Sequence, residues 1–202
     1  MRALLLALAS LSLAAQTPAP AFDEAFFGGD RRAVLEGCAD KVRALKPKDA
    51  KYLAECGRAY LAALDKPKAE AAFREAEARE SKDGEVLQLI AVAWLKHGYK
   101  TEALETYEKI LQRDPKNKDA LTQAGVDLAE VGLVAEAERY MNALAALEKD
   151  WRRFLQFGRA LLVAGQRRKA APWFARAVAL KPGEEKLYLE ISRTFAETQS
   201  VM

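Results

Sequence analysis

Residues 84–117 read GEVLQLIAVAWLKHGYKTEALETYEKILQRDPKN, and this stretch decides the fold. Leu87, Ile90 and Trp94 recur at intervals of three and four, so they fall on one face of a helix. Gly98 interrupts the pattern, and a second helical run ends at Pro115, because proline cannot continue a helix interior. Neither helix can bury its apolar stripe alone. The stretch therefore predicts a helix hairpin that packs against neighbouring hairpins.

The hairpin pattern is repeated along the chain at steps of 34, 34 and 33 residues. A small residue marks the middle of each first helix, and an apolar residue follows three positions later: Gly57, Ala91, Gly125 and Gly158, then Tyr60, Trp94, Leu128 and Leu161. Each second helix carries an alanine and, four positions on, a large apolar residue: Ala69, Ala103, Ala137 and Ala170, then Phe73, Tyr107, Met141 and Phe174. This constant register indicates copies of one unit.

With this register the sequence resembles the tetratricopeptide repeat (TPR) family over residues 50–184. The early tryptophan of the family pattern is replaced by Leu53, Leu87, Leu121 and Phe154. The resemblance implies an all-α fold, a right-handed α-solenoid of stacked helix-turn-helix repeats that ends in a capping helix. Repeats are expected at residues 50–83, 84–117, 118–150 and 151–184, with a degenerate half-repeat at 22–49 and the capping helix and tail at 185–202.

The first residues predict a secretory signal peptide over residues 1–15. Arg2 provides a short positive region, Ala3 to Leu13 form an apolar region, and Ala14 and Ala15 offer small residues at the cleavage point. A membrane anchor left in place is the alternative, although a spanning helix needs roughly 20 apolar residues. Residues 16–21, with two prolines, are typical of an extended linker. We therefore expect a periplasmic or secreted protein with no stable membrane insertion after cleavage.

The placement of the two cysteines predicts a disulfide. Pro47 lies 68 residues before Pro115, so the segment that ends at Pro47 corresponds to the second helix of a shortened repeat. Cys38 and Cys56 are equidistant from Pro47, and residues equidistant from the turn of an antiparallel hairpin face each other. In an exported protein such a bridge is expected to form, and the loop-entropy model assigns it roughly 3 kcal/mol. Two buried free thiols are the alternative.

Residues suited to catalysis are scarce. His97 is the only histidine and lies beside a turn glycine, so no second histidine helps it to hold a metal or activate a nucleophile. The many carboxylates alternate with basic residues at helical spacing, which is typical of solvated faces. We expect no enzyme activity, no cofactor and no metal. The small formal net charge of +3, together with export, argues against a nucleic-acid partner.

Resemblance to TPR proteins implies that the first helices line a groove that receives a partner segment. The expected groove residues are Arg58, Lys96, Arg152, Leu155, Arg159, Leu162, Lys186, Leu189 and Arg193. Basic residues surround leucines toward the carboxy terminus, which favours an acidic or carboxylate-bearing peptide with an apolar side chain. A solvated basic face without a ligand is the alternative. Trp151 and Trp173 fall just off the apolar stripes, so we expect them to be partly exposed contact anchors.

The sequence thus favours an exported, non-enzymatic protein–protein interaction scaffold that binds a protein or peptide. One alternative is a self-assembling structural component of an envelope or secretion complex, whose terminal helices dock onto other copies. A carrier of a small ligand would need a closed apolar pocket, which no stretch indicates. Pro172, in the second turn of a second helix, is expected either to remove a hydrogen bond from that helix or to shorten it.

Overall fold

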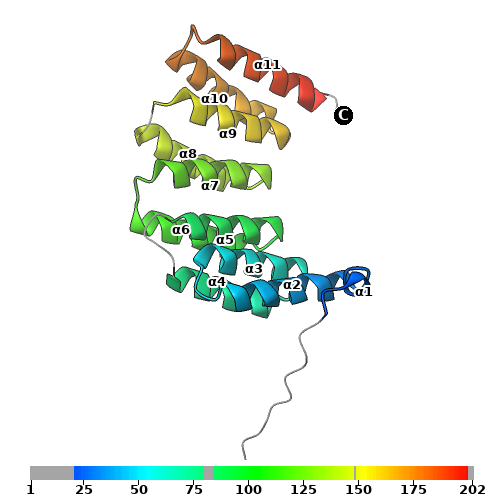
Figure 1. Cartoon of the computed structure of the whole chain (residues 1–202). Coiled ribbons are helices and arrows are strands. Elements are labelled where there is room, and N and C mark those ends of the chain that lie inside the picture. Colours follow the sequence, from blue (N-terminus) through cyan, green and yellow to red (C-terminus); the bar gives the residue numbers. More distant parts are fainter. Residues whose placement is uncertain (1–20, 80–83, 148, 200–202) are drawn as a thin grey trace, which may run out of the picture.

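The protein is an elongated stack of helices. The computed structural model describes residues 21–79, 84–147 and 149–199, and the signal peptide and most of the linker predicted above lie outside these ranges. The described residues form eleven α-helices and no strand (Figure 1). These helices are α1 (Glu24–Phe27), α2 (Arg31–Leu45), α3 (Ala50–Ala62), α4 (Lys66–Arg79), α5 (Glu85–Lys96), α6 (Lys100–Arg113), α7 (Lys118–Glu130), α8 (Val134–Leu147), α9 (Trp151–Val163), α10 (Arg167–Leu180) and α11 (Glu185–Gln199).

The middle eight helices form four hairpins, in which α3 packs on α4, α5 on α6, α7 on α8 and α9 on α10. We call the first helix of a hairpin its A helix and the second its B helix. The side chains of Asp49, Asn117 and Asp150 accept hydrogen bonds from backbone N–H groups at the starts of three A helices. The chain is therefore a solenoid of TPR-like hairpins, with each A helix also packed on the next A helix.

The turns between A and B helices need a left-handed residue. Gly98, Gly132 and Gly165 occupy this place with φ angles of 82°, 79° and 75°. In the first hairpin the place belongs to Leu64, which adopts φ 63° with its side chain 84% exposed. A leucine in this conformation is strained, because its Cβ crowds the backbone.

Small residues in the A helices allow the two helices of a hairpin to approach closely. A Cβ atom added at Gly57 would lie 2.3 Å from the ring of Phe73, and one at Gly158 would lie 2.7 Å from the ring of Phe174. At Gly125 the added atom would lie 2.5 Å from Met141. The large apolar side chain of each B helix thus rests directly on the backbone of its A helix, which explains the paired register of small and large residues.

Ion pairs connect each B helix to the next B helix. Their partners are separated by 31 to 36 positions, about one repeat, and they are Arg43–Glu75, Lys68–Glu36, Lys66–Glu102, Lys109–Glu77, Arg139–Glu108 and Lys169–Glu138. Three further pairs connect successive A helices: Lys51–Glu85, Arg153–Asp119 and Arg159–Glu190. Most of these side chains are well exposed, so each pair alone contributes little. Together they form a ladder along the stack.

The predicted disulfide is absent, because both cysteines are free thiols. The spacing about Pro47 does bring α2 against α3, but the Cys56 thiol donates to the carbonyl oxygen of Ala39 at 3.3 Å. Cys38 precedes Ala39 and therefore lies about 100° around the helix from it. Equal distance from a turn sets the height of two residues along a hairpin, whereas a bridge also requires both side chains to point into the shared seam.

Two expectations about the last hairpin are resolved by its packing. Trp151 and Trp173 are buried, with 7% and 6% of their surface exposed, so neither is the exposed anchor predicted above. The Trp173 ring packs edge-on against Phe157 at a centroid distance of 4.9 Å. Pro172 does not shorten α10, which has 14 residues like α4, α6 and α8. Its missing N–H instead leaves the Arg168 carbonyl without its usual intrahelical donor.

Candidate functional site

The exposed side of the A helices forms a continuous polar strip, which we call the A-helix face. Its residues are at least partly exposed and occupy equivalent positions: Lys51, Glu55 and Arg58 on α3; Glu85, Leu89 and Lys96 on α5; Asp119, Gln123 and Glu130 on α7; Arg152, Gln156, Arg159 and Val163 on α9; Lys186, Glu190 and Arg193 on α11. They recur at intervals of three and four, so each set lies on one side of its helix.

The structure separates the predicted groove residues into two groups. The six basic residues are exposed: Arg58, Lys96, Arg152, Arg159, Lys186 and Arg193. Leu155 and Leu162, in contrast, are 7% and 5% exposed, so they cannot line a groove. The next A helix, α11, packs on α9 and covers this side of it. On α11 the equivalent of Leu155 is Leu189, which is 55% exposed because the described chain provides no further A helix.

An acidic residue divides the basic cluster at the carboxy-terminal end. Glu190 accepts from Arg159 at 3.3 Å through one carboxylate oxygen and from Arg193 at 3.3 Å through the other. Arg152 lies over the Trp151 ring at 4.8 Å and 3.6 Å from Asp150. The sequence reasoning overlooked Glu190, although its position one helical turn from Lys186 and three residues before Arg193 was a readable signal. A carboxylate ligand at this cluster must therefore compete with Glu190.

Charge is distributed unevenly along the A-helix face. Residues 151–183 carry eight lysines and arginines and no aspartate or glutamate. On α7, by contrast, the face carries Asp119 and Glu130, with Asp127 beside them. Burial raises the pKa of Glu130, and the nearby Asp127 raises it further. The last hairpin is thus the part of the stack best suited to attract a negatively charged segment.

A buried polar group links the second hairpin to the third. The Tyr107 hydroxyl donates to Asp127 at 2.5 Å, and the Gln123 amide donates to the other oxygen of the same carboxylate at 2.7 Å. Burial raises the pKa of Asp127, while the hydrogen bonds from Tyr107 and Gln123 oppose the rise. The equivalent A-helix residues in the other hairpins are alanines, at Ala59, Ala93 and Ala160. The sequence did carry a signal for this contact: Asp127 stands at an alanine position, and Tyr107 stands where the other hairpins have Phe73, Met141 and Phe174.

Other titratable groups at the seams have structural partners. The Tyr60 hydroxyl donates to Asp40 at 2.6 Å, and burial is the main cause that raises the pKa of Tyr60. Tyr140 donates to Glu108 at 3.0 Å, and burial raises its pKa to about 12. Burial, together with the charge of Arg58, lowers the pKa of His97. In each case burial between the helices is the largest cause of the pKa shift.

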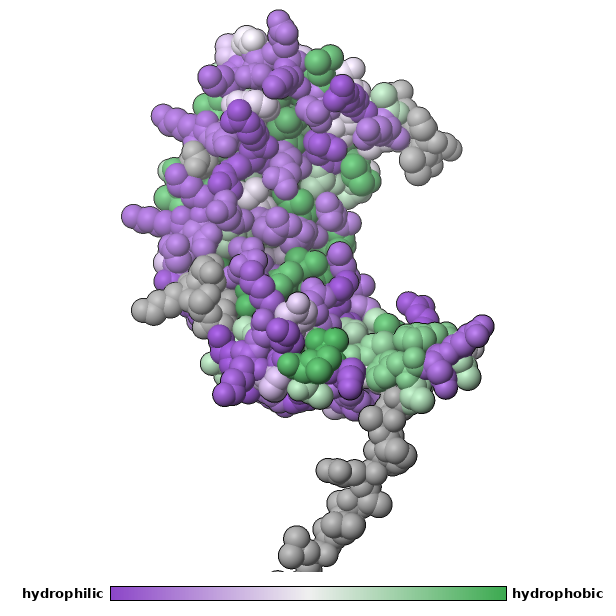
Figure 2. Space-filling view, in the orientation of Figure 1, coloured by the Kyte–Doolittle hydropathy of each residue, from purple (hydrophilic) through white to green (hydrophobic). Residues whose placement is uncertain are grey.

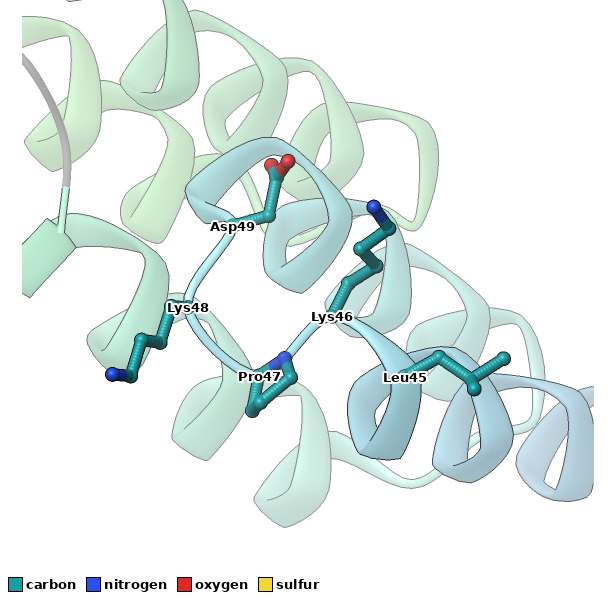
Figure 3. Close-up of a pocket in the computed structure, with 5 residues that line it drawn as sticks. All are labelled: Leu45, Lys46, Pro47, Lys48 and Asp49. Atoms are coloured by element: carbon teal, nitrogen blue, oxygen red, sulfur yellow. The ribbon is translucent and has the colours of Figure 1, made fainter.

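The described residues offer little to a small ligand or a metal. Within the described ranges no group of three or more His, Cys, Asp and Glu side chains could hold a metal ion. A shallow depression of about 400 Å³ lies at the α2–α3 loop, lined by Leu45, Lys46, Pro47, Lys48 and Asp49. Figure 3 shows the side chains of Lys46, Lys48 and Leu45 pointing away from one another, so they do not converge on a common point. No helix within the described ranges is both long and apolar enough to cross a membrane.

Comparisons with known proteins add a fold similarity. No protein-family model matches the chain, and no curated protein matches it significantly. Among solved structures it is similar to YrrB, described as a TPR protein with an unusual peptide-binding site, with a TM-score of 0.46 and 20% identity. That similarity covers 81% of this chain and 84% of YrrB.

Proposed function

We infer that this solenoid of TPR-like hairpins is a non-enzymatic scaffold. It binds an extended segment of another protein along the A-helix face. The observation that carries this proposal is the A-helix face itself, an exposed strip over five helices that includes the last hairpin, where every charged residue is basic. An extended chain laid across successive helices can contact several repeats at once, which a compact pocket cannot offer.

The chemistry of the last hairpin favours an acidic segment. Arg152 and Arg159 lie one above the other on the exposed side of α9, with Gln156 between them. Guanidinium groups bind carboxylates through charge-assisted hydrogen bonds. Because Leu155 and Leu162 are buried, recognition rests on charge and on exposed Val163 and Leu189 rather than on an apolar groove floor.

A pair of peptide pools tests this preference. The pools are identical except that one carries three glutamates where the other carries three glutamines, and binding to the full chain is followed by fluorescence anisotropy. We expect the glutamate pool to bind more tightly, and more weakly as salt is added. Arg159→Ala should weaken that binding, whereas Glu190→Gln should strengthen it, because the competing carboxylate charge is removed. Arg74→Ala, an exposed arginine on a B helix, is the control. Equal binding of both pools, or an equal effect of Arg74→Ala, would remove the A-helix face from the proposal.

Export is a separate part of the proposal and rests on the amino-terminal sequence alone. Cleavage after Ala15 leaves Gln16 as the first residue of the mature protein. Intact mass measurement of the protein from its native host tests this expectation. A protein that retains residues 1–15 and stays in the cytoplasm would contradict export while leaving the interaction surface unaffected.

A further inference from the structure

The described chain begins and ends with half a repeat. The ion pairs Arg43–Glu75 and Lys68–Glu36 join α2 to α4 with a separation of 32 residues, the same separation as Lys109–Glu77 between α4 and α6. Helix α2 thus occupies the place of a B helix, although only the four-residue α1 precedes it. At the other end α11 packs on α9 as an A helix, and Arg159–Glu190 joins the two.

Within the described residues no B helix follows α11, and one side of α11 is uncovered. Tyr188 is 46% exposed, whereas Phe154, its equivalent one repeat earlier, is 1% exposed. Leu189 is 55% exposed, whereas its equivalent Leu155, which the next A helix covers, is 7% exposed. The side of α11 that faces α9 and α10 is packed normally, since Leu187 is 0% exposed and the Phe195 ring lies 5.9 Å from that of Phe174. The carboxy-terminal end of the stack therefore presents a single apolar surface where the next helix would lie.

Among residues 21–30 only the short α1 precedes α2, and the matching side of α2 is incompletely covered. Leu35, Cys38 and Val42 are only partly buried. Their equivalents on α4, which pack on a complete A helix, are Ala69, Ala72 and Ala76, each 0% exposed. Phe22, which precedes α1, and Phe27, its last residue, are 37% and 57% exposed and add apolar surface. Figure 2 shows a patch of hydrophobic colour at this end of the molecule. The amino-terminal end thus has a B helix without a full A helix, and the carboxy-terminal end has an A helix without a B helix.

The two ends also match in side-chain size and in charge. In three hairpins a glycine of the A helix receives a large residue of the B helix, and a Cβ atom there would lie within 2.3 to 2.7 Å of that residue. On α11 the glycine position holds Ser192, and on α2 the large residue is replaced by Ala39. Helix α2 carries four basic and two acidic side chains, whereas α11 carries three acidic and two basic ones. Opposite charges at the two ends favour head-to-tail contact over contact between like ends.

We propose that α11 of one copy packs against α2 of a second copy, so that the two half-repeats complete one repeat across the molecular boundary. Helix α2 of the second copy fills the B position on α11, and α11 fills the A position beside Leu35 and Val42. Figure 1 places α1 and the end of α11 on the same edge of the molecule, the edge on which a covalent hairpin has its A-to-B turn. The contact joins two different surfaces, so each copy can bind a further copy at each end and assembly continues past a dimer.

Sedimentation velocity of the full chain, from micromolar to millimolar concentration, tests this contact. We expect the mean mass to rise with concentration past that of a dimer. Leu189→Glu blocks the carboxy-terminal end and Leu35→Arg blocks the amino-terminal end, and each should weaken association by about tenfold or more. Leu147→Glu changes a 37% exposed leucine in the middle of the stack and is the matched control.

Mixing the two blocked variants gives the decisive result. At a concentration where each variant alone is a monomer, an equimolar mixture should form a heterodimer, because one variant keeps a functional amino-terminal end and the other a functional carboxy-terminal end. Phe27→Arg replaces Leu35→Arg if circular dichroism shows that the latter does not fold. A protein that is monomeric at every concentration, a dimer that grows no further, or blocked variants that fail to complement each other would overturn the proposal.

Discussion

The Tyr107–Asp127 hydrogen bond joins the second hairpin to the third, and a double-mutant cycle can measure its contribution to stability. Asp127→Ala leaves the buried Tyr107 hydroxyl without its acceptor, which costs about 1–3 kcal/mol. Tyr107→Phe removes the donor and leaves the carboxylate with Gln123, at a cost of about 1 kcal/mol. The double variant places Phe opposite Ala, as Phe73 lies opposite Ala93 one repeat earlier. Its loss of stability should therefore be smaller than the sum of the single losses by about 1–2 kcal/mol.

The contribution of Asp127 to stability is expected to depend on pH. Burial raises the pKa of Asp127 in the folded protein, so the folded state binds the proton more tightly than the unfolded chain does. The stabilisation that Asp127 provides is thus fully present below the unfolded pKa and is lost as pH rises through the folded pKa. Asp127→Ala should cost more free energy of unfolding near pH 4 than near pH 8. In the Tyr107→Phe background the dependence should steepen, because the hydrogen bond that lowers the Asp127 pKa has been removed.

Urea unfolding provides the measurement, followed by far-ultraviolet circular dichroism and by tryptophan fluorescence, whose transitions must coincide for a two-state free energy to apply. Gln123→Ala serves as a control, because it removes the weaker of the two donors and leaves the Tyr107 hydroxyl satisfied. Single losses that add to within about 0.5 kcal/mol would show that the two side chains do not act together. A cost of Asp127→Ala that grows with pH would refute the assigned direction of the pKa shift.

Substitutions at Leu64 and Gly57 and a titration of the two thiols test further contacts. Leu64→Gly should raise the free energy of unfolding by about 1 kcal/mol in chemical denaturation, because it relieves the backbone strain at φ 63°. The lost side chain contributes little packing, since Leu64 is 84% exposed. No gain in stability would show that the turn is unstrained. Gly57→Ala should lower the free energy of unfolding by about 1–3 kcal/mol, because the new methyl group overlaps the Phe73 ring. Adding Phe73→Leu to the same chain should recover part of that loss. If the second substitution instead adds a further, independent loss, the close contact is contradicted. Thiol titration should reveal two free cysteines. Half-buried Cys38 should react before Cys56, because burial raises the pKa of the Cys56 thiol. A single reaction phase would contradict this order, and no reaction before reduction would contradict the free thiols.

Repeat spacing was sufficient to predict the hairpins, because the step between Gly57, Ala91, Gly125 and Gly158 determines which residues must be small and which large. The spacing could not predict which A-helix residues remain exposed. The exposure of a residue depends on what packs beyond its helix. Leu155 and Leu189 hold equivalent positions, yet Leu155 is 7% exposed and Leu189 is 55% exposed. A single apolar stripe was also too simple a criterion for Trp151 and Trp173, since an inner helix of a stack is covered by neighbours on more than one side.

Side-chain direction accounts for the remaining differences. The distances of Cys38 and Cys56 from Pro47 indicate their height along the hairpin, whereas the helical phase of α2 places Ala39, not Cys38, against Cys56. Glu190 and Asp127 were readable as departures from the repeat pattern, one an acid inside a basic cluster and the other an acid at an alanine position. Comparing each residue with its equivalents in the other hairpins therefore locates special contacts better than scanning for known motifs.

The ladder of ion pairs between successive B helices has a mechanical consequence. Each pair reaches past the intervening A helix, so it resists bending of one hairpin relative to the next without adding to the apolar contacts between them. Attraction between exposed charges is screened over about 8 Å at physiological ionic strength and over still shorter distances in concentrated salt. We therefore expect the stack to bend more easily in concentrated salt than in dilute buffer, while its apolar contacts keep the helices packed.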